Sequence, residues 1–356
     1  MPRSWHPAVF LLPLYIFTQN SLTLLNLPAF HSTRVKTHGR ISMKFATLLV
    51  IPSGIAFCFA LFTCLSVPSP ARASGRARIA EPVVQVLPTQ PTAAPSTVDE
   101  TVFNQVIDQT IGSYQGLAGL HGASILSKKD WALDDLMGAL ASQIGHTWEI
   151  EFYGGFARTL GMTSDAFTLT VCHELGHHFG GFPFYRPTAT LAAEGEADYF
   201  AAFSCLRNLW KSQTAENSTY RKQVSATLQN KCDHAWSSVN DQDLCYRIIT
   251  ASQRLASSFY NSTSKFNPAP SVDRSDTTRV AETYVWHSSA QCRLDTFVNG
   301  ALCRKSFDLT VIPGKPDDSG MTTGDPEQQA NQYSCSSTSS DFQVGSRPFC
   351  WFKPEL

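Results

Sequence analysis

One short run of residues, Cys172-His173-Glu174-Leu175-Gly176-His177-His178, constrains the fold of this chain more than any other feature. It follows Thr163-Ser164-Asp165, whose threonine is a candidate N-cap and whose aspartate is an acidic residue for the first turn. A Gly-Gly pair at Gly180 ends the apolar pattern, as glycines just past a helix often do. The stretch is therefore predicted to be one helix, with His173 and His177 on the same face of successive turns.

Two imidazoles in that arrangement can bind one zinc ion through nitrogens at about 2.0–2.1 Å. Glu174 is one residue further along and points away from the metal axis, so it is predicted to act as a general base on a water molecule. His178 lies about 100° around the helix from His177 and is expected to pack or to support a ligand.

A third ligand is expected from a second predicted helix, residues 190–210, which carries Glu194-Gly195-Glu196-Ala197-Asp198. Asp198 shares the face of Glu194 and is predicted to accept the outer N–H of a ligating histidine. Glu196 should face the other way. The sequence thus predicts one Zn²⁺ ion with three ligands, His173, His177 and Glu194.

These two motifs, HELGHH followed by EGEAD, resemble those of the gluzincin metallopeptidases, and Glu-x-x-Ala-Asp is most similar to the branch that contains the CAAX prenyl proteases and bacterial envelope quality-control proteases. Members of that branch typically carry a downstream His-Pro with an arginine six positions after the histidine. Here His287 is followed at that distance by Arg293, and Ser288 replaces the proline. The resemblance covers roughly residues 100–300.

The resemblance implies a zincin-like domain that hydrolyses peptide bonds, with a peptide or protein as substrate. It also implies His287 and Arg293 as candidates to stabilise the tetrahedral intermediate. Arg293 has an alternative role as a salt-bridge partner of Asp295 or Asp198. Two other functions remain open: a catalytically idle binding or chaperone-like protein with the same fold, and a zinc hydrolase that acts on a non-peptide substrate.

The predicted fold class is α+β, mainly helical with a small sheet. Residues 148–152 alternate apolar and acidic side chains, which is typical of a half-buried strand, and Gly154 ends the pattern. We expect this to be an edge strand beside the zinc helix, either adding an extended peptide as a further strand or simply bordering the core. Helical spacing is present at 102–111, 131–144 and within 212–260.

The N-terminal part divides into segments of different composition. Residues 1–42 look like an extra segment or a start codon placed too early, and residues 43–73 have the apolar stretch and the A-x-A pattern of a signal peptide. Membrane anchoring, or lipidation at Cys64, is the alternative. Residues 74–98 are predicted to be a linker, 99–310 the metallopeptidase domain, and 311–356 a cysteine-containing C-terminal extension.

Composition narrows the partners and the compartment. The chain has 28 basic and 29 acidic residues, with no long run of either sign, so nothing in its charge favours nucleic acid. No segment after residue 73 is apolar enough to span a membrane. Eight cysteines follow the predicted signal, and an even number permits four disulfides in an exported, periplasmic or extracellular protein. The pairing and the oligomeric state stay open.

Overall fold

The computed structural model describes residues 77–80, 94–134, 138–186, 190–260, 268–315, 324–338 and 341–355. In chain order its elements are β1 (Ala77–Ala80), α1 (Glu100–Leu120), β2 (Ser124–Asp130), β3 (Ala139–Ile144), β4 (Thr147–Tyr153), α2 (Gly154–Ala157), α3 (Ser164–Phe179), α4 (Glu194–Phe200), η1 (Ala201–Cys205), α5 (Leu206–Trp210), α6 (Thr214–Thr219), η2 (Tyr220–Lys222), α7 (Ala226–Ala235), α8 (Val239–Ser258), α9 (Ala290–Leu302) and α10 (Pro326–Tyr333). Residues 1–42, the predicted signal 43–73 with Cys64, and most of the linker 74–98 lie outside the described residues. In the part that is described, no helix combines the length and apolar character needed to cross a membrane.

The mixed helical and sheet architecture confirms the α+β class at that level. The sheet has the order β1-β3-β4-β2, in which β2 is parallel to β4 and the other pairs are antiparallel. The strand predicted at 148–152 is confirmed as β4, with Trp148, Ile150 and Phe152 buried. Its predicted edge position is wrong, because β2 pairs with one side of β4 and β3 with the other.

The helix predicted over 131–144 is also wrong. Its second half forms β3, which pairs with β4 from Ala139 to Ile144. Gly145, with a φ of +58°, and His146 connect the two strands in a two-residue turn of the kind that favours left-handed glycine. The sequence of β3, Ala-Leu-Ala-Ser-Gln-Ile, mixes residues that favour helix with residues that favour strand, so pairing with β4 decides the conformation.

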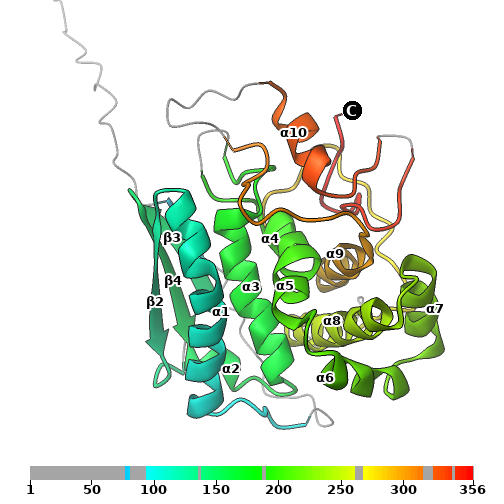
Figure 1. Ribbon diagram of the computed structural model, residues 1–356, viewed down its shortest axis with the longest axis horizontal. Coiled ribbons are helices and arrows are strands. Elements are labelled where there is room, and N and C mark those ends of the chain that lie inside the picture. The colour runs from blue at the N-terminus through cyan, green and yellow to red at the C-terminus, as the bar shows by residue number, and fades with distance from the viewer. Residues whose placement is uncertain are drawn as a thin grey trace, which may run out of the picture. The chain divides into compact units, whose positions relative to one another are not determined.

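Two helices, α1 and α3, cover one face of the sheet, and α4, α5, α8 and α9 pack on the far side of α3 (Figure 1). Aromatic side chains join these layers: Phe103 of α1 stacks on Phe167 of α3 at 5.2 Å, and Trp148 of β4 meets Phe179 of α3 at 5.0 Å. Because α3 lies in the middle layer, nearly all of its residues are buried. A polar motif on this helix is therefore held away from bulk water.

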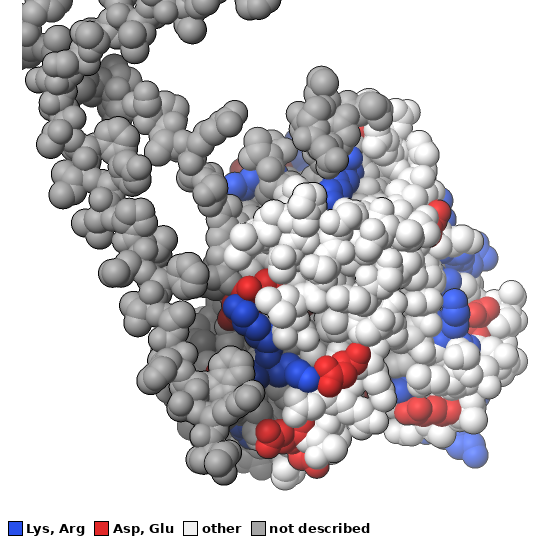
Figure 2. Space-filling model, turned by 60° about the vertical axis from the view of Figure 1, so that its left-hand side comes forward, with Lys and Arg blue, Asp and Glu red and all other residues white. Residues whose placement is uncertain are grey.

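The side of the molecule that carries the sheet is charged but balanced. Lys128 of β2 contacts Glu149 of β4 at 2.8 Å, and Lys129 contacts Asp108 of α1 at 2.8 Å. Figure 2, in which the left-hand side of the first view comes forward, shows basic and acidic side chains next to one another on a largely uncharged surface. The net charge of −1 agrees with this mixture.

Both ends of α3 follow from the sequence. The Thr163 hydroxyl accepts a hydrogen bond from the Ala166 N–H at 3.2 Å, which confirms the predicted N-cap. After Gly180, the chain turns at Gly181 with a φ of +82°. A Cβ atom at Gly181 would lie 2.1 Å from the Pro313 carbonyl oxygen, so only glycine fits there.

The second motif helix begins at Glu194, later than the predicted residue 190. The preceding residues are extended, because Ala192 N–H donates to the His177 carbonyl at 2.7 Å and Ala193 N–H donates to the Pro183 carbonyl at 2.8 Å. From Glu194, α4 continues through the π-helical turn η1 into α5, which ends at Trp210 as predicted.

All eight cysteines beyond the predicted signal form disulfides. The pairs are Cys172–Cys205, Cys232–Cys245, Cys292–Cys350 and Cys303–Cys335. The first ties the motif helix α3 to η1, and the last two tie the C-terminal segment to both ends of α9. The prediction of four bridges is confirmed.

The C-terminal segment, residues 324–355 as far as described, packs on α4 and is more than the surface excursion that its polar sequence suggests. The Trp351 ring lies so close to Gly195 that a Cβ atom there would be 2.2 Å from it. The buried Arg347 pairs with Glu196, and the Tyr199 hydroxyl donates to the Gly345 carbonyl at 2.8 Å. This segment therefore completes the packing around the second motif helix.

Candidate metal centre

A glycine allows the two motif helices to approach closely enough for their side chains to meet. Gly176, between the two histidines of α3, faces Ala197 of α4, and a Cβ atom on Gly176 would lie 2.7 Å from the Ala197 carbonyl oxygen. Any larger residue would push the helices apart. With glycine, His173 and His177 are brought opposite Glu194, the first residue of α4.

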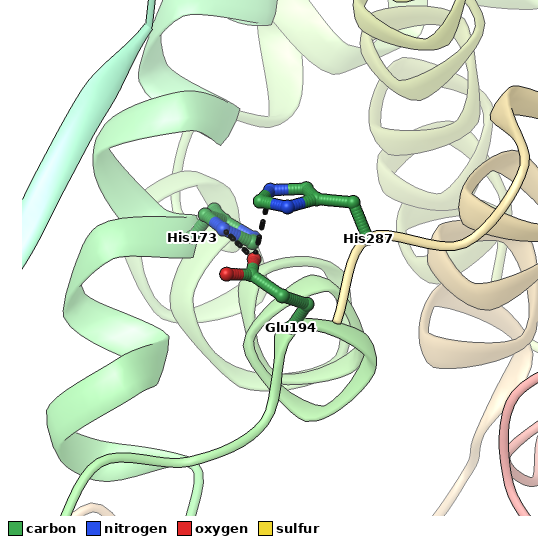
Figure 3. A group of neighbouring side chains, drawn as sticks. All are labelled: His173, Glu194 and His287. Carbon is green, nitrogen blue, oxygen red and sulfur yellow. Dashed lines mark ion pairs between the residues drawn. The ribbon is translucent and has the colours of Figure 1, made fainter. Parts of the chain in front are cut away.

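Three imidazoles converge on one carboxylate oxygen. The Nε2 atoms of His173 and His177 lie 3.2 and 3.6 Å from Glu194 Oε2, and Nε2 of His287 lies 3.1 Å from the same oxygen. Figure 3 shows the Glu194 carboxylate between the rings of His173 and His287. Donor atoms of His173, Glu194 and His287 all lie within 4.8 Å of one another.

The other nitrogen of each motif histidine is already engaged. His173 Nδ1 lies 2.7 Å from Asp198 Oδ1, and His177 Nδ1 lies 2.9 Å from the Ala192 carbonyl oxygen. An acceptor at Nδ1 fixes the proton there and leaves the Nε2 lone pair directed at the centre. The predicted supporting residue Asp198 and the backbone of Ala192 thus orient one ring each.

Asp198 is itself held by Arg293 of α9. The guanidinium donates from Nε and Nη2 to the two carboxylate oxygens, each at 2.8 Å, in a buried bidentate pair. It also lies over the Phe259 ring at 4.0 Å. Of the two roles predicted for Arg293, this geometry matches the salt bridge to Asp198.

A strap of extended chain places His287. Tyr284 N–H donates to the Trp351 carbonyl at 2.7 Å, and the Val285 carbonyl accepts from the Glu194 N–H at 3.2 Å. The segment before His287 is therefore tied both to the C-terminal segment and to the start of α4. The His287 side chain keeps 14% of its surface exposed, more than the other groups of the centre.

Opposing effects act on the acid groups of the centre. Burial raises the pKa of Glu194, but the imidazoles of His177, His287 and His173, when they are protonated in the absence of a metal, outweigh it and bring that pKa below its usual range. Burial likewise raises the pKa of Asp198, while Arg293 and His173 lower it further than burial raises it. Both groups are therefore carboxylates at neutral pH.

The donor set fits zinc. Nitrogens and oxygens bound to one tetrahedral zinc ion at about 2.0–2.1 Å lie about 3.3–3.4 Å apart. The separations from Glu194 Oε2 to Nε2 of His173 and His177, 3.2 and 3.6 Å, bracket that spacing. Imidazole and carboxylate are also the ligand types that zinc accepts in a site that keeps one position open.

Glu174 and His178 complete the account of the first motif. Glu174 is fully buried on α3, one residue beyond His173. The His178 ring stacks on Trp148 at 4.9 Å with an angle of 8° between the planes. Burial, together with the charges of His177 and Lys315, lowers the pKa of His178 well below its usual value. It is a neutral packing residue, one of the two roles expected.

Sequence reasoning missed an aromatic pair beside the centre. The rings of Tyr185 and Trp286 meet edge to face with centroids 4.3 Å apart, and Trp286 is 49% exposed. Each lies on a strap that leads to a residue of the centre, since Trp286 precedes His287 and Tyr185 belongs to the loop before Glu194. The sequence did show each large aromatic residue within a loop of polar composition, but no sequence pattern indicated that the two loops meet.

Comparisons with family models, curated proteins and solved structures found no match for this chain.

Proposed function

We propose that this chain is a zinc-dependent peptidase of the gluzincin type, with one zinc ion held by His173, His177 and Glu194. The observation that carries the proposal is the convergence of imidazole Nε2 atoms on Glu194 Oε2 while both motif Nδ1 atoms are occupied. Such an arrangement holds the rings in the tautomer that binds a metal. The resemblance of the two motifs to those of gluzincins supports the same function.

Glu174 is the general base in this proposal. A bound zinc ion would supply Lewis-acid chemistry, lowering the pKa of a water molecule and polarising the scissile carbonyl. Glu174 takes the proton of that water as it attacks, and then returns the proton to the leaving amine. His287 approaches from the opposite strap and donates a hydrogen bond to the oxygen that develops negative charge.

The remaining residues position these groups. Arg293 holds Asp198, and Asp198 holds His173, so Arg293 acts as a positioning residue two contacts away from the centre. The exposed Tyr185–Trp286 pair offers an apolar surface beside His287, suited to a substrate side chain with an apolar body.

A peptide or protein substrate would bind in extended form as a strand beside β3, in the position that β1 takes in this structure. This replaces the strand addition predicted for 148–152, since β4 is paired on both sides. Backbone hydrogen bonds to a sheet edge hold a peptide with little regard to its sequence.

Four disulfides in the described residues fit an oxidising compartment. With the predicted signal peptide, they support export to the periplasm or the exterior as part of the proposal.

The test compares zinc content and hydrolysis for residues 74–356, oxidised, with those of two variants. Glu174→Gln should keep one zinc ion per chain, measured by mass spectrometry of the metal, and should lose about 10²- to 10⁴-fold in cleavage of casein or a peptide library. Glu100→Gln, an exposed change at the start of α1, is the matched control and should match the wild type.

Absence of bound zinc from the oxidised wild-type chain would refute the proposed centre. Bound zinc without cleavage of any peptide, with equal behaviour of Glu174→Gln, would instead favour the catalytically idle binding protein. Hydrolysis of ester or amide probes that are not peptides, lost in Glu174→Gln, would favour the non-peptide zinc hydrolase.

A further inference from the structure

A segment from the predicted linker lies along the strand that borders the candidate centre. β1, residues 77–80, pairs antiparallel with β3, and the register places Ala77 opposite Gln143, Ile79 opposite Ala141 and Ala80 opposite Leu140. β1 precedes α1, which begins at Glu100. Its contribution to the sheet is a single added strand at an edge.

The edge of β3 leads directly to the metal centre. The Thr190 hydroxyl donates to Gln143 Oε1 at 2.6 Å, and two residues later the Ala192 carbonyl lies 2.9 Å from His177 Nδ1. The motif helix α3 also packs against β3. Ala77, opposite Gln143, is therefore the end of β1 nearest to this connection.

The other strands do not offer such an edge. β4 is enclosed between β3 and β2, and β2, at the opposite border of the sheet, packs against α1. Among the described strands, the outer side of β3 is thus the one where an extended peptide would lie next to α3. Strand addition uses main-chain hydrogen bonds, which any segment of extended chain can supply.

We propose that residues 77–80 occupy the peptide-binding edge in cis, so that the chain is a latent enzyme until this segment is displaced. The position of residues 77–80 follows from the β1–β3 pairing, whereas the claim that they inhibit the enzyme rests on the proposed function. An extended substrate and β1 compete for the same N–H and C=O groups of β3.

The ligand class follows from the kind of contact. A partner in trans would be any unfolded or extended peptide segment, recognised by its backbone along β3. Affinity in cis is raised by linkage, because an attached segment is present at an effective concentration of about millimolar order. A free substrate must exceed that concentration or bind more tightly to displace β1.

The first experiment weakens β1 without changing the length of the chain. Successive N–H groups of a strand point to opposite sides, so in Arg78→Pro/Ile79→Pro one of the two lost donors is on the β3 side whichever the phase. We expect this variant of residues 74–356 to show at least tenfold higher kcat/KM on peptides than the wild type. Arg78→Ala/Ile79→Ala is the matched control, which removes the same side chains, keeps both N–H groups and should remain latent.

The second experiment reads occupancy without catalysis. A fluorescent peptide of residues 75–81 is titrated into the double-proline chain that also carries Glu174→Gln, and binding is followed by anisotropy. N-methylation at Ala77 and Ile79 should differ sharply from N-methylation at Arg78 and Ala80, because only one set of amides faces β3. This alternation with a period of two is the signature of strand pairing.

The two readouts separate the inference from the function on which it rests. Alternating peptide binding with no hydrolysis by any variant would sustain β1 occupancy and refute the peptidase. Equal hydrolysis by the wild-type and double-proline chains, with no peptide binding, would sustain the peptidase and overturn the inference. Equal loss of binding at all four N-methylated positions would also overturn it.

Discussion

The helix α4 carries three buried carboxylates that serve two different regions of the molecule. Glu194 and Asp198 face the histidines of α3, whereas Glu196 lies on the other side and contacts Arg347 of the C-terminal segment. All three are at most 2% exposed. Burial of an acid therefore does not distinguish a site of chemistry from an anchor.

The partners make the distinction. Glu194 Oε2 meets imidazole Nε2 atoms, which are lone-pair donors when the rings are neutral and can share a metal with the carboxylate. Glu196 instead accepts two hydrogen bonds from one guanidinium, which is always charged and has no lone pair to offer a metal. In the proposed centre, one face of α4 would bind a cation from outside the chain, whereas the other face is already paired with the guanidinium of Arg347.

The two faces of α4 also explain why glycine occurs at Gly176 and at Gly195. Gly176 of α3 allows the approach on the metal side, and Gly195 of α4 leaves room for the Trp351 ring on the anchoring side. α4 is thus held between α3, which carries the proposed ligands His173 and His177, and the C-terminal segment, which contributes none of the proposed ligands. Rigid support on the second side holds Glu194 in register with the histidines.

The largest expected effect comes from Glu194→Gln, which removes the proposed ligand but keeps the shape of the side chain. Zinc should fall from one ion per chain to a trace after dialysis, and peptide cleavage should fall to background. The unfolding free energy of the metal-free chain should not decrease, because a buried charge is removed. Metal analysis and urea unfolding in EDTA check both expectations.

Glu196→Gln, two residues along the same helix, is the matched buried control for that change: it should lower the free energy of unfolding, because Arg347 loses its partner, but the folded chain should keep its zinc. Retention of a full zinc ion by Glu194→Gln would mean that the two faces of α4 do not differ in metal binding. The third ligand would then be the imidazole of His287 and not the carboxylate of Glu194.

The next largest effect is on the free energy of unfolding, and it comes from Arg347→Met. Burial raises the pKa of Glu196 to about 7 although Arg347 opposes the shift, which indicates a strongly desolvated pair. Arg347→Met leaves Glu196 buried without the partner that its oxygens now contact, so it should lower the free energy of unfolding by about 3–5 kcal/mol. The double variant Glu196→Gln/Arg347→Met should recover most of that loss.

Urea unfolding with the disulfides intact measures the effect of Arg347→Met. Cys292–Cys350 and Cys303–Cys335 then keep the C-terminal segment attached, so that the measurement reports the contact and not detachment of the segment. A double variant as unstable as the single would mean that the pair is not the source of the loss.

Local sequence patterns predicted the face of α4 that carries Glu194 and Asp198, but little of the face that carries Glu196. Thr163, the His-x-x-x-His spacing and the Glu-x-x-x-Asp spacing each act within one or two helical turns, and helix geometry converts them into shared faces. Their positions relative to one another were therefore predictable once two helices were assumed. The close approach that joins them depends on Gly176, whose role only becomes visible with Ala197 opposite it.

The rest depends on contacts between residues far apart in the chain. Residues 139–144 have no strong local preference for helix or strand, and pairing with β4 makes them a strand. Disulfide partners and the Glu196–Arg347 pair likewise carry no local pattern. The Ala192 carbonyl, which orients His177, is a backbone group, and no side chain marks it in the sequence.

The smallest effect concerns the support of the ligands. Asp198→Asn weakens the acceptor for His173 Nδ1, and loss of such an outer partner lowers metal affinity by about 10- to 100-fold. Arg293→Gln should act in the same direction and by less, because Asp198 remains in place but loses its bidentate partner. Competition with a fluorescent zinc chelator measures both affinities.

The pair of variants also decides how Arg293 acts. A positioning residue changes zinc affinity and leaves KM close to the wild-type value once zinc is saturating, and the double variant Asp198→Asn/Arg293→Gln should be no weaker in zinc binding than Asp198→Asn alone. If Arg293 instead contacts the substrate, Arg293→Gln will bind zinc normally and lose activity at saturating metal. That result would place Arg293 of α9 among the residues that contact the substrate.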